Sequence, residues 1–130
     1  MLRPLASRLL TPAALATIAT LDMALVVGVA TLTPLPKMVS VGGSDKLHHV
    51  LAFIGLALPV SLLRPRWLPL AVVLLAAYGG AIELIQPLVG RSCELADWLA
   101  DLAGIGLGAV IGLTVHWSVR LGLGLRRRAA

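Results

Sequence analysis

Four long apolar runs dominate this chain of 130 residues. They extend over residues 11–31, 46–63, 67–86 and 95–119, and proline, glycine and charged residues separate them. A helix needs about 20 apolar residues to cross the hydrocarbon core of a bilayer. The pattern therefore predicts an all-α, polytopic membrane protein, in which four transmembrane helices form one bundle and residues 1–130 form a single domain.

The composition supports a membrane protein over a soluble one. Hydrophobic residues make up 58% of the chain and charged residues only 13%, whereas a soluble domain has roughly 45–50% and about 25%. The formal net charge of +5 would raise the question of nucleic acid in a soluble protein. Here the cations lie at the ends of apolar runs, so we expect the lipid bilayer as a partner and no nucleic acid.

The basic residues also predict the orientation of the bundle. With four crossings, the two termini and the turn between the second and third runs lie on the same side. That side has eight basic residues: Arg3, Arg8, Arg64, Arg66, Arg120, Arg126, Arg127 and Arg128. The other side has three: Lys37, Lys46 and Arg91. By the positive-inside rule, both termini are cytoplasmic.

Each apolar run has one face that combines small and polar residues, because residues three or four apart share a helix face. In the fourth run this stripe begins with two carboxylates and continues with glycine at every fourth position: Asp97, Asp101, Gly104, Gly108 and Gly112. Glycine lets another helix approach closely. The stripe is therefore expected to face protein rather than lipid.

The polar faces of the second, third and fourth runs are expected to converge at the outer end of the bundle. We call the resulting set the polar cluster: Asp45, Lys46, His49, Glu83, Gln86, Arg91, Asp97 and Asp101. A charge at the centre of a membrane helix costs roughly 2.5–3.5 kcal/mol. The buried carboxylates therefore need partners, and Lys46 and Arg91 are the natural ones.

Two interpretations of the polar cluster remain open. Its members can fix the register of the helices, or they can line a polar pocket that opens to the outer surface. One or two polar contacts suffice to set a register, and ionisable groups inside a membrane are functional candidates by default. Eight ionisable or amide groups at one end of the bundle therefore favour the pocket.

Three residues outside the polar cluster carry smaller expectations. Asp22 lies near the middle of the first run and has no obvious partner. His116 lies near the cytoplasmic end of the fourth run, where an interfacial role is more common than a ligand role. Cys93 is the single cysteine, so no internal disulfide forms.

Several segments of the chain resemble those of the VanZ-like family, in the same order. Residues 45–53, DKLHHVLAF, resemble the family's D-K-x-x-H-F-x-A-F segment, with Val50 in place of Phe. Residues 83–86, ELIQ, resemble E-x-x-Q, and residues 90–97, GRSCELAD, resemble G-R-x-x-x-x-x-D. Residues 101–104, DLAG, resemble N-x-x-G, with Asp101 in place of Asn. The TPLP of residues 33–36 is similar to the stretch after the family's first helix.

The resemblance implies a small four-helix protein of the bacterial cell envelope, in the cell (inner) membrane. The named member of the family is associated with low-level resistance to the glycopeptide teicoplanin, so a role in teicoplanin susceptibility is an expectation. The resemblance carries over the site residues rather than an activity. Asp101, where the family has Asn, puts in doubt any role that needs a neutral amide donor there.

Three hypotheses about function follow. In the first, the protein is not an enzyme, and its outer pocket binds a lipid headgroup, a glycopeptide or a partner protein. Lys46 and Arg91 would then pair with an anionic group, and Glu83, Gln86 and Asp97 would set its orientation.

In the second hypothesis the protein is an enzyme that acts on a lipid or a lipid-linked substrate. His49 would do general acid–base work with Asp97 or Glu83. Ser92 and Cys93 are possible nucleophiles, although neither has a base at a diagnostic spacing.

The third hypothesis is an accessory subunit that packs into a larger membrane complex through its glycine stripes. No cofactor is expected. Carboxylates and His49 are residue types that hold a divalent metal, but their spacing fits no motif such as H-E-x-x-H, so no metal site is predicted from the sequence.

Overall fold

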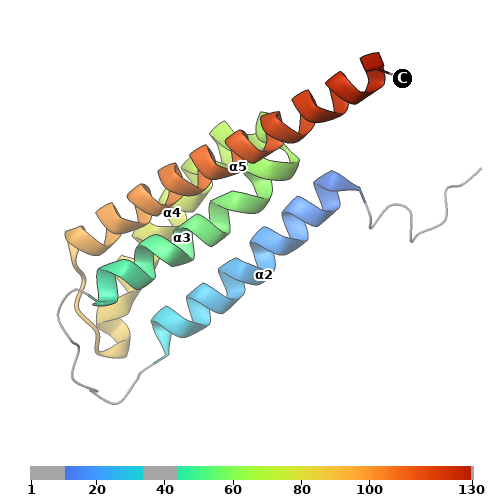
Figure 1. The fold of residues 1–130 in the computed structure, drawn as a ribbon. Coiled ribbons are helices and arrows are strands. Elements are labelled where there is room, and N and C mark those ends of the chain that lie inside the picture. Colours follow the sequence, from blue (N-terminus) through green and yellow to red (C-terminus); the bar gives the residue numbers. More distant parts are fainter. Residues whose placement is uncertain (1–10, 34–43, 130) are drawn as a thin grey trace, which may run out of the picture.

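The computed structural model describes residues 11–33 and 44–129, and its regular structure is helical. The four long helices are α2 (Pro12–Leu32), α3 (Ser44–Leu63), α4 (Leu68–Ile85) and α5 (Leu95–Ala129). Two short 3-10 helices, η1 (Pro65–Trp67) and η2 (Gln86–Val89), flank α4. The described residues include no strand. The predicted all-helical fold is therefore confirmed (Figure 1).

All four helices are long and apolar enough to cross a membrane. The predicted bounds of the first three differ from the observed bounds by no more than two residues. The fourth was predicted to end at Val119, but α5 continues to Ala129. No proline interrupts the tail, and leucine and arginine are good helix formers, so the basic segment extends the helix. Arg3, Arg8 and Lys37, which enter the predicted orientation, lie outside the described residues.

Local sequence signals account for the helix ends. Thr11 caps α2, because its hydroxyl accepts a hydrogen bond from the Ala14 N–H at 3.2 Å. Pro12 follows at the first helical position, where the missing N–H costs nothing. At the other end of the bundle Gly90 closes η2 with a φ of 79°, a left-handed conformation that favours glycine.

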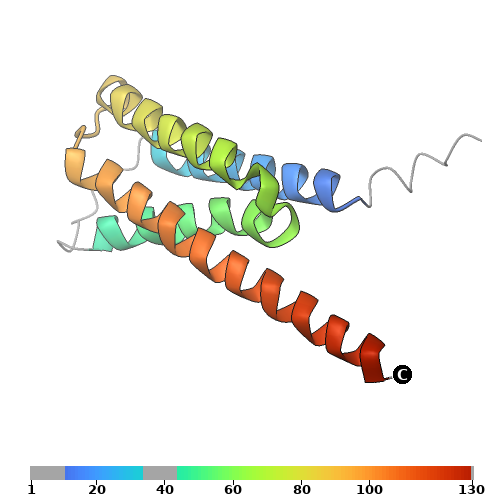
Figure 2. The same cartoon turned by 90° about the horizontal axis from the view of Figure 1, so that it is seen from above.

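Consecutive helices run in opposite directions, so α3 and α5 are parallel to each other (Figure 1). α2 begins and α5 ends at the same end of the bundle. The opposite end, where α2 and α4 finish and α3 and α5 begin, is called the cluster end below. α3 packs on α2, α4 and α5, and its contact with α5 is the most extensive. Figure 2 shows α5 crossing the bundle and extending beyond it.

The glycine stripe of α5 brings that helix against the backbone of α3. A Cβ atom at Gly104 would lie 2.5 Å from the Val50 carbonyl oxygen, and one at Gly108 would lie 2.6 Å from that of Ile54. Both separations are shorter than real contacts of a Cβ atom. The Ser61 hydroxyl also donates across the interface to the Gly108 carbonyl at 3.2 Å. The prediction that the stripe faces protein is confirmed.

The apolar core is small and the apolar surface is large. The buried core joins residues of α2, α3, α4 and α5: Val27, Phe53, Leu56, Ala57, Leu75, Ile82 and Ile105. Many large apolar side chains on all four helices are exposed, such as Leu25, Leu70, Leu84 and Val110. A soluble monomer rarely exposes such continuous apolar surface. This distribution fits helices whose outer faces contact lipid.

Close packing at Gly104 predicts that alanine substitutions at two glycines of α5 differ in their effect on stability. Gly104→Ala forces α5 away from α3, and overpacking of this kind costs about 1–3 kcal/mol. Nothing lies within 4 Å of a Cβ at Gly106, so Gly106→Ala is expected to be neutral or stabilising, because alanine favours the helix. Thermal unfolding of the two purified variants in detergent measures the difference. Equal melting temperatures would contradict this packing.

Candidate functional site

The polar cluster assembles at the cluster end, as its spacing predicted. α3 supplies Asp45, Lys46 and His49, the last turns of α4 and η2 supply Glu83 and Gln86, and α5 supplies Asp97 and Asp101. Arg91 lies in the turn between η2 and α5. Five members are buried, namely His49, Glu83, Gln86, Asp97 and Asp101, whereas Asp45 and Lys46 are exposed. The site is thus a buried polar floor with charged groups at its mouth.

The deepest contact of the polar cluster joins α3 to α5. His49 Nδ1 lies 2.8 Å from Asp101 Oδ1, and both side chains are buried. A carboxylate in this position orients the imidazole ring and selects which ring nitrogen carries the proton. The enzymatic hypothesis paired His49 with Asp97 or Glu83 for general acid–base work. The structure gives the hydrogen bond to Asp101 instead.

Glu83 bonds to backbone rather than to a basic side chain. Its Oε2 accepts the Glu94 N–H at 3.0 Å. With the Gln86 amide oriented to suit its neighbours, the Gln86 NH₂ donates to the same Oε2 at 3.3 Å and to the Ser92 carbonyl at 3.0 Å. Glu83 Oε1 is buried and has no hydrogen-bond partner among the described residues. The same holds for Asp101 Oδ2.

Two groups of ion pairs lie at the mouth. Lys46 Nζ lies 3.2 Å from Asp97 Oδ1 and 3.4 Å from Glu94 Oε2. Arg91 Nη2 lies 3.7 Å from Asp45 Oδ1. The predicted pairing of Lys46 with Asp97 is confirmed. Glu83 and Asp101, which were also expected to pair with Lys46 or Arg91, bond to other groups.

A pocket of about 300 Å³ opens beside the polar cluster, between α2 and α3. Its wall is apolar, and its rim carries polar groups from α3 and from the turn before α5. The wall consists of Val26, Val27, Ala30, Ala52 and Phe53, with Thr31 at its edge, and the rim consists of Asp45, His48, His49 and Arg91. Three of the predicted site residues, Asp45, His49 and Arg91, therefore border a cavity that also contacts the surface of α2.

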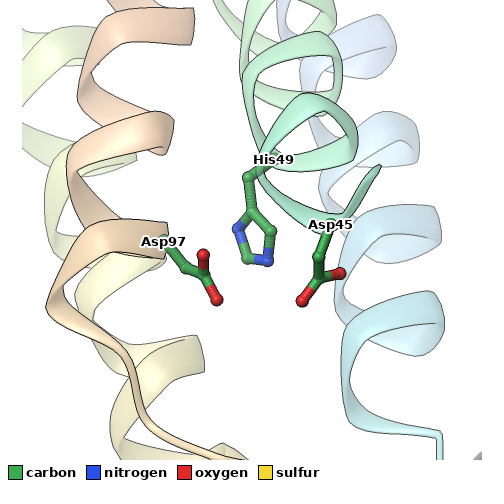
Figure 3. A group of neighbouring side chains, drawn as sticks. All are labelled: Asp45, His49 and Asp97. Carbon is green, nitrogen blue, oxygen red and sulfur yellow. The ribbon is translucent and has the colours of Figure 1, made fainter. Parts of the chain in front are cut away.

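Two overlapping sets of side chains have the composition and spacing of metal ligands. One consists of Asp45, His49 and Asp97, which Figure 3 shows with the imidazole between the two carboxylates. The other consists of His49, Glu83 and Asp101, which are all buried. In each set, one ligand atom from every member lies within 4.8 Å of the others. The sequence motifs did not indicate these sets, because their members come from different helices.

Two residues of the site were not among the predicted members. Glu94 provides the backbone N–H for Glu83 and a carboxylate for Lys46. His48 borders the pocket beside His49. The signal for Glu94 was its position three residues before Asp97, immediately before the start of α5. His48 had no comparable signal, because it lies on a different face of α3 from His49.

The remaining candidate residues lie apart from the polar cluster. Asp22 is on an exposed face of α2. His116 Nδ1 lies 2.6 Å from the Leu62 carbonyl oxygen, where it links α5 to the end of α3. Cys93 is free and exposed. Ser92 donates to Glu94 Oε1 at 3.2 Å, which leaves it without a histidine base.

Fold and site together define a class of protein: a small bundle of four membrane-length helices with a buried polar cluster at one end. No protein-family model, curated protein or solved structure matches the chain. The resemblance to the VanZ-like family, and the role in teicoplanin susceptibility that it implies, therefore stay predictions.

The hydrogen bond between His49 and Asp101 predicts coupling between the two side chains. Asp101→Ala leaves a buried imidazole without its partner, which lowers the free energy of unfolding by about 1–3 kcal/mol. His49→Ala has a similar effect, and the double variant is expected to lose less than the sum of the two. Thermal unfolding in detergent measures all three.

Glu94→Ala provides the control, because it removes an exposed carboxylate and keeps the backbone N–H that Glu83 accepts. It is expected to change stability by no more than about 0.5 kcal/mol. Additive losses in the double variant would show that the two side chains do not interact in the folded protein.

Proposed function

We propose that this chain is a multi-pass protein of the bacterial inner membrane that binds a phospholipid in the pocket at its cluster end. The head group we assign carries both a phosphate and a primary amine. The observation that carries the proposal is the pocket itself, which joins an apolar wall from α2 and α3 to a rim with one cation and one carboxylate. A phospholipid has the same division between tail and head.

The rim suits a zwitterionic head better than a purely anionic one. Arg91 Nη2 and Asp45 Oδ1 are 3.7 Å apart, which is longer than a hydrogen bond, and both side chains are partly exposed. A loose, solvated ion pair of this kind contributes little to stability. The phosphate of a lipid can therefore bind the Arg91 guanidinium, which contacts phosphate in a bidentate manner. The amine of the same lipid head binds the Asp45 carboxylate. Lys46 is already held by Glu94 and Asp97.

The head group supplies the selectivity. Lipid tails are as apolar as the helix surfaces, so moving a tail from the bilayer to the pocket wall gains packing but no hydrophobic free energy. Val27 and Phe53 provide a buried, rigid part of that wall. The binding preference among lipids of equal chain length is then expected to follow the head group.

The basic residues support an outward-facing pocket. Arg64 and Arg66 lie at the end of the bundle opposite the cluster end, and an excess of Lys and Arg is typical of the cytoplasmic side of a membrane protein. The pocket would then contact the outer leaflet of the membrane.

This proposal predicts an order of lipid retention. Native mass spectrometry of the purified protein, exchanged into equal mixtures of three lipids with identical chains, is expected to show phosphatidylethanolamine retained above phosphatidylcholine and phosphatidylglycerol. Phosphatidylcholine has no N–H to donate to Asp45, and phosphatidylglycerol has no cation for it. Asp45→Asn is expected to remove the preference, and Arg91→Ala to reduce the binding of all three at least tenfold.

Two controls match these variants. Arg66→Ala removes an exposed cation at the opposite end, and Val73→Trp adds bulk to an exposed face of α4. Both are expected to bind like wild type, whereas Ala30→Trp fills the pocket wall and is expected to block binding. Equal retention of the three lipids by wild type, or unchanged binding in Ala30→Trp, would refute the proposal.

One observation favours a second candidate function, an enzyme that acts on the bound phospholipid. A buried imidazole oriented by a carboxylate, as His49 is by Asp101, is the arrangement of a general base. Incubating the purified protein with phosphatidylethanolamine and analysing the lipid by mass spectrometry tests this. A product that wild type forms and His49→Gln does not would support it, and an unchanged lipid would leave binding as the function.

A further inference from the structure

Three buried ligand groups from three different helices meet below the mouth of the polar cluster. They are His49 of α3, Glu83 of α4 and Asp101 of α5, with exposed fractions of 5%, 4% and 0%. One ligand atom from each lies within 4.8 Å of the other two. Because the residues are far apart in the sequence, only the packing of the bundle brings them together.

Two carboxylate oxygens in this group have no partner. Glu83 Oε1 and Asp101 Oδ2 are buried and accept no hydrogen bond from the described residues. The other oxygen of each carboxylate is held, Glu83 Oε2 by the Glu94 N–H and Asp101 Oδ1 by His49. A buried acceptor without a partner costs about 1–3 kcal/mol, and more when it is charged. Carboxylates that bind metals show the division seen at Glu83, because outer-shell hydrogen bonds hold them in place.

The free oxygen of Asp101 is directed toward α4. A Cβ atom at Gly79 would lie 2.6 Å from Asp101 Oδ2, so the carboxylate reaches the α4 surface where glycine leaves room. Gly79 is one turn before Glu83 and shares its helix face. The unpartnered oxygen of Asp101 therefore lies beside the helix face that carries Glu83.

The charges around this group do not balance. Five carboxylates gather at the cluster end: Asp45, Glu83, Glu94, Asp97 and Asp101. Among the described residues only Lys46 and Arg91 form ion pairs with them through a permanent cation. With all five carboxylates ionised and the histidines neutral, the group would carry three negative charges in excess of its two cations. Unpaired charge in a membrane bundle is costly, so a further positive charge would stabilise it.

We propose that His49, Glu83 and Asp101 bind one divalent transition-metal ion. A mixed nitrogen and oxygen donor set suits an ion such as Mn²⁺ or Zn²⁺ better than Ca²⁺ or Mg²⁺, which take oxygen ligands. Adjacent ligands of a six-coordinate ion lie about 3.0 Å apart when the bonds are near 2.1 Å. The ion would replace the hydrogen bond between His49 Nδ1 and Asp101 Oδ1, whose 2.8 Å separation suits two such ligands.

The set formed by Asp45, His49 and Asp97 gives the ion a route to this site. Asp97 and Asp45 flank His49 on the side of the mouth (Figure 3), so an ion arriving from the exposed end first meets these two carboxylates. His49 belongs to both sets, so the ion can pass from one set to the other. The proposal does not depend on the phospholipid, because Glu83 and Asp101 do not line the pocket and the three ligands bind the ion without the lipid.

Titration with Mn²⁺ tests the site on the full-length protein. The protein is purified in detergent, stripped with EDTA and titrated while electron paramagnetic resonance records free Mn²⁺. One ion per chain is expected to bind, and Zn²⁺ is expected to displace it. Glu83→Gln and Asp101→Asn, which keep the side-chain shape, are each expected to weaken Mn²⁺ binding at least tenfold.

Asp22→Asn is the matched control, because it removes a carboxylate from an exposed face of α2 and is expected to bind like wild type. Thermal unfolding of wild type with Mn²⁺ or with EDTA gives a second measurement that needs no variant. A higher melting temperature with Mn²⁺ supports the site. Binding that Glu83→Gln and Asp101→Asn leave unchanged would overturn it, as would a wild-type protein that binds neither ion and melts at the same temperature in both solutions.

Lipid retention is measured separately on the EDTA-treated protein. If the protein retains the lipid but does not bind the metal, only the metal proposal fails. If it binds the metal but does not retain the lipid, only the phospholipid proposal fails.

Discussion

The close contact between α3 and α5 is the constraint on which the rest of the structure depends. Gly104 and Gly108 allow the backbones to touch, and the Ser61 hydrogen bond to the Gly108 carbonyl connects them. In a bilayer, packing and interhelical hydrogen bonds hold helices together, because lipid offers an equally apolar alternative. The glycines therefore do for this bundle what a large apolar core does for a soluble one. Asp101 lies one turn before Gly104 in α5, and the same close approach of the helices places it against His49.

The polar cluster has a gradient of exposure that follows from this geometry. Arg91, Asp45 and Lys46 are at the mouth and partly solvated, and the loose ion pair of Arg91 with Asp45 exchanges readily with other charged groups. His49, Glu83 and Asp101 are below them and buried. Hydrogen bonds hold one atom of each deep carboxylate, which makes the floor rigid while the mouth adapts. A rigid polar floor with an adaptable rim suits recognition better than the fixing of helix register alone.

The sequence predicted the four helices and the members of the polar cluster well, because both depend on local patterns. Runs of about 20 apolar residues identify membrane-length helices, and spacings of three and four place Asp97 and Asp101 on one face. The partners within the cluster were predicted less well. Pairing by charge alone assigned Glu83 to Lys46 or Arg91, whereas a backbone N–H and an amide bind it. Such partners depend on how the turn before α5 folds. The spacing of polar residues along the helices does not predict the conformation of that turn.

The alternating directions of the helices have an electrostatic consequence for the cluster end. α3 and α5 begin there, and each helix start carries roughly half a positive charge from its aligned peptide dipoles. Asp45 and Asp97, in the first turns of these helices, lie in this positive potential. α4 finishes there, so Glu83 lies near a helix end of negative partial charge. The electrostatic potential thus becomes more negative from the first turns of α3 and α5 toward Glu83, and the backbone alone would draw a small cation inward along that path.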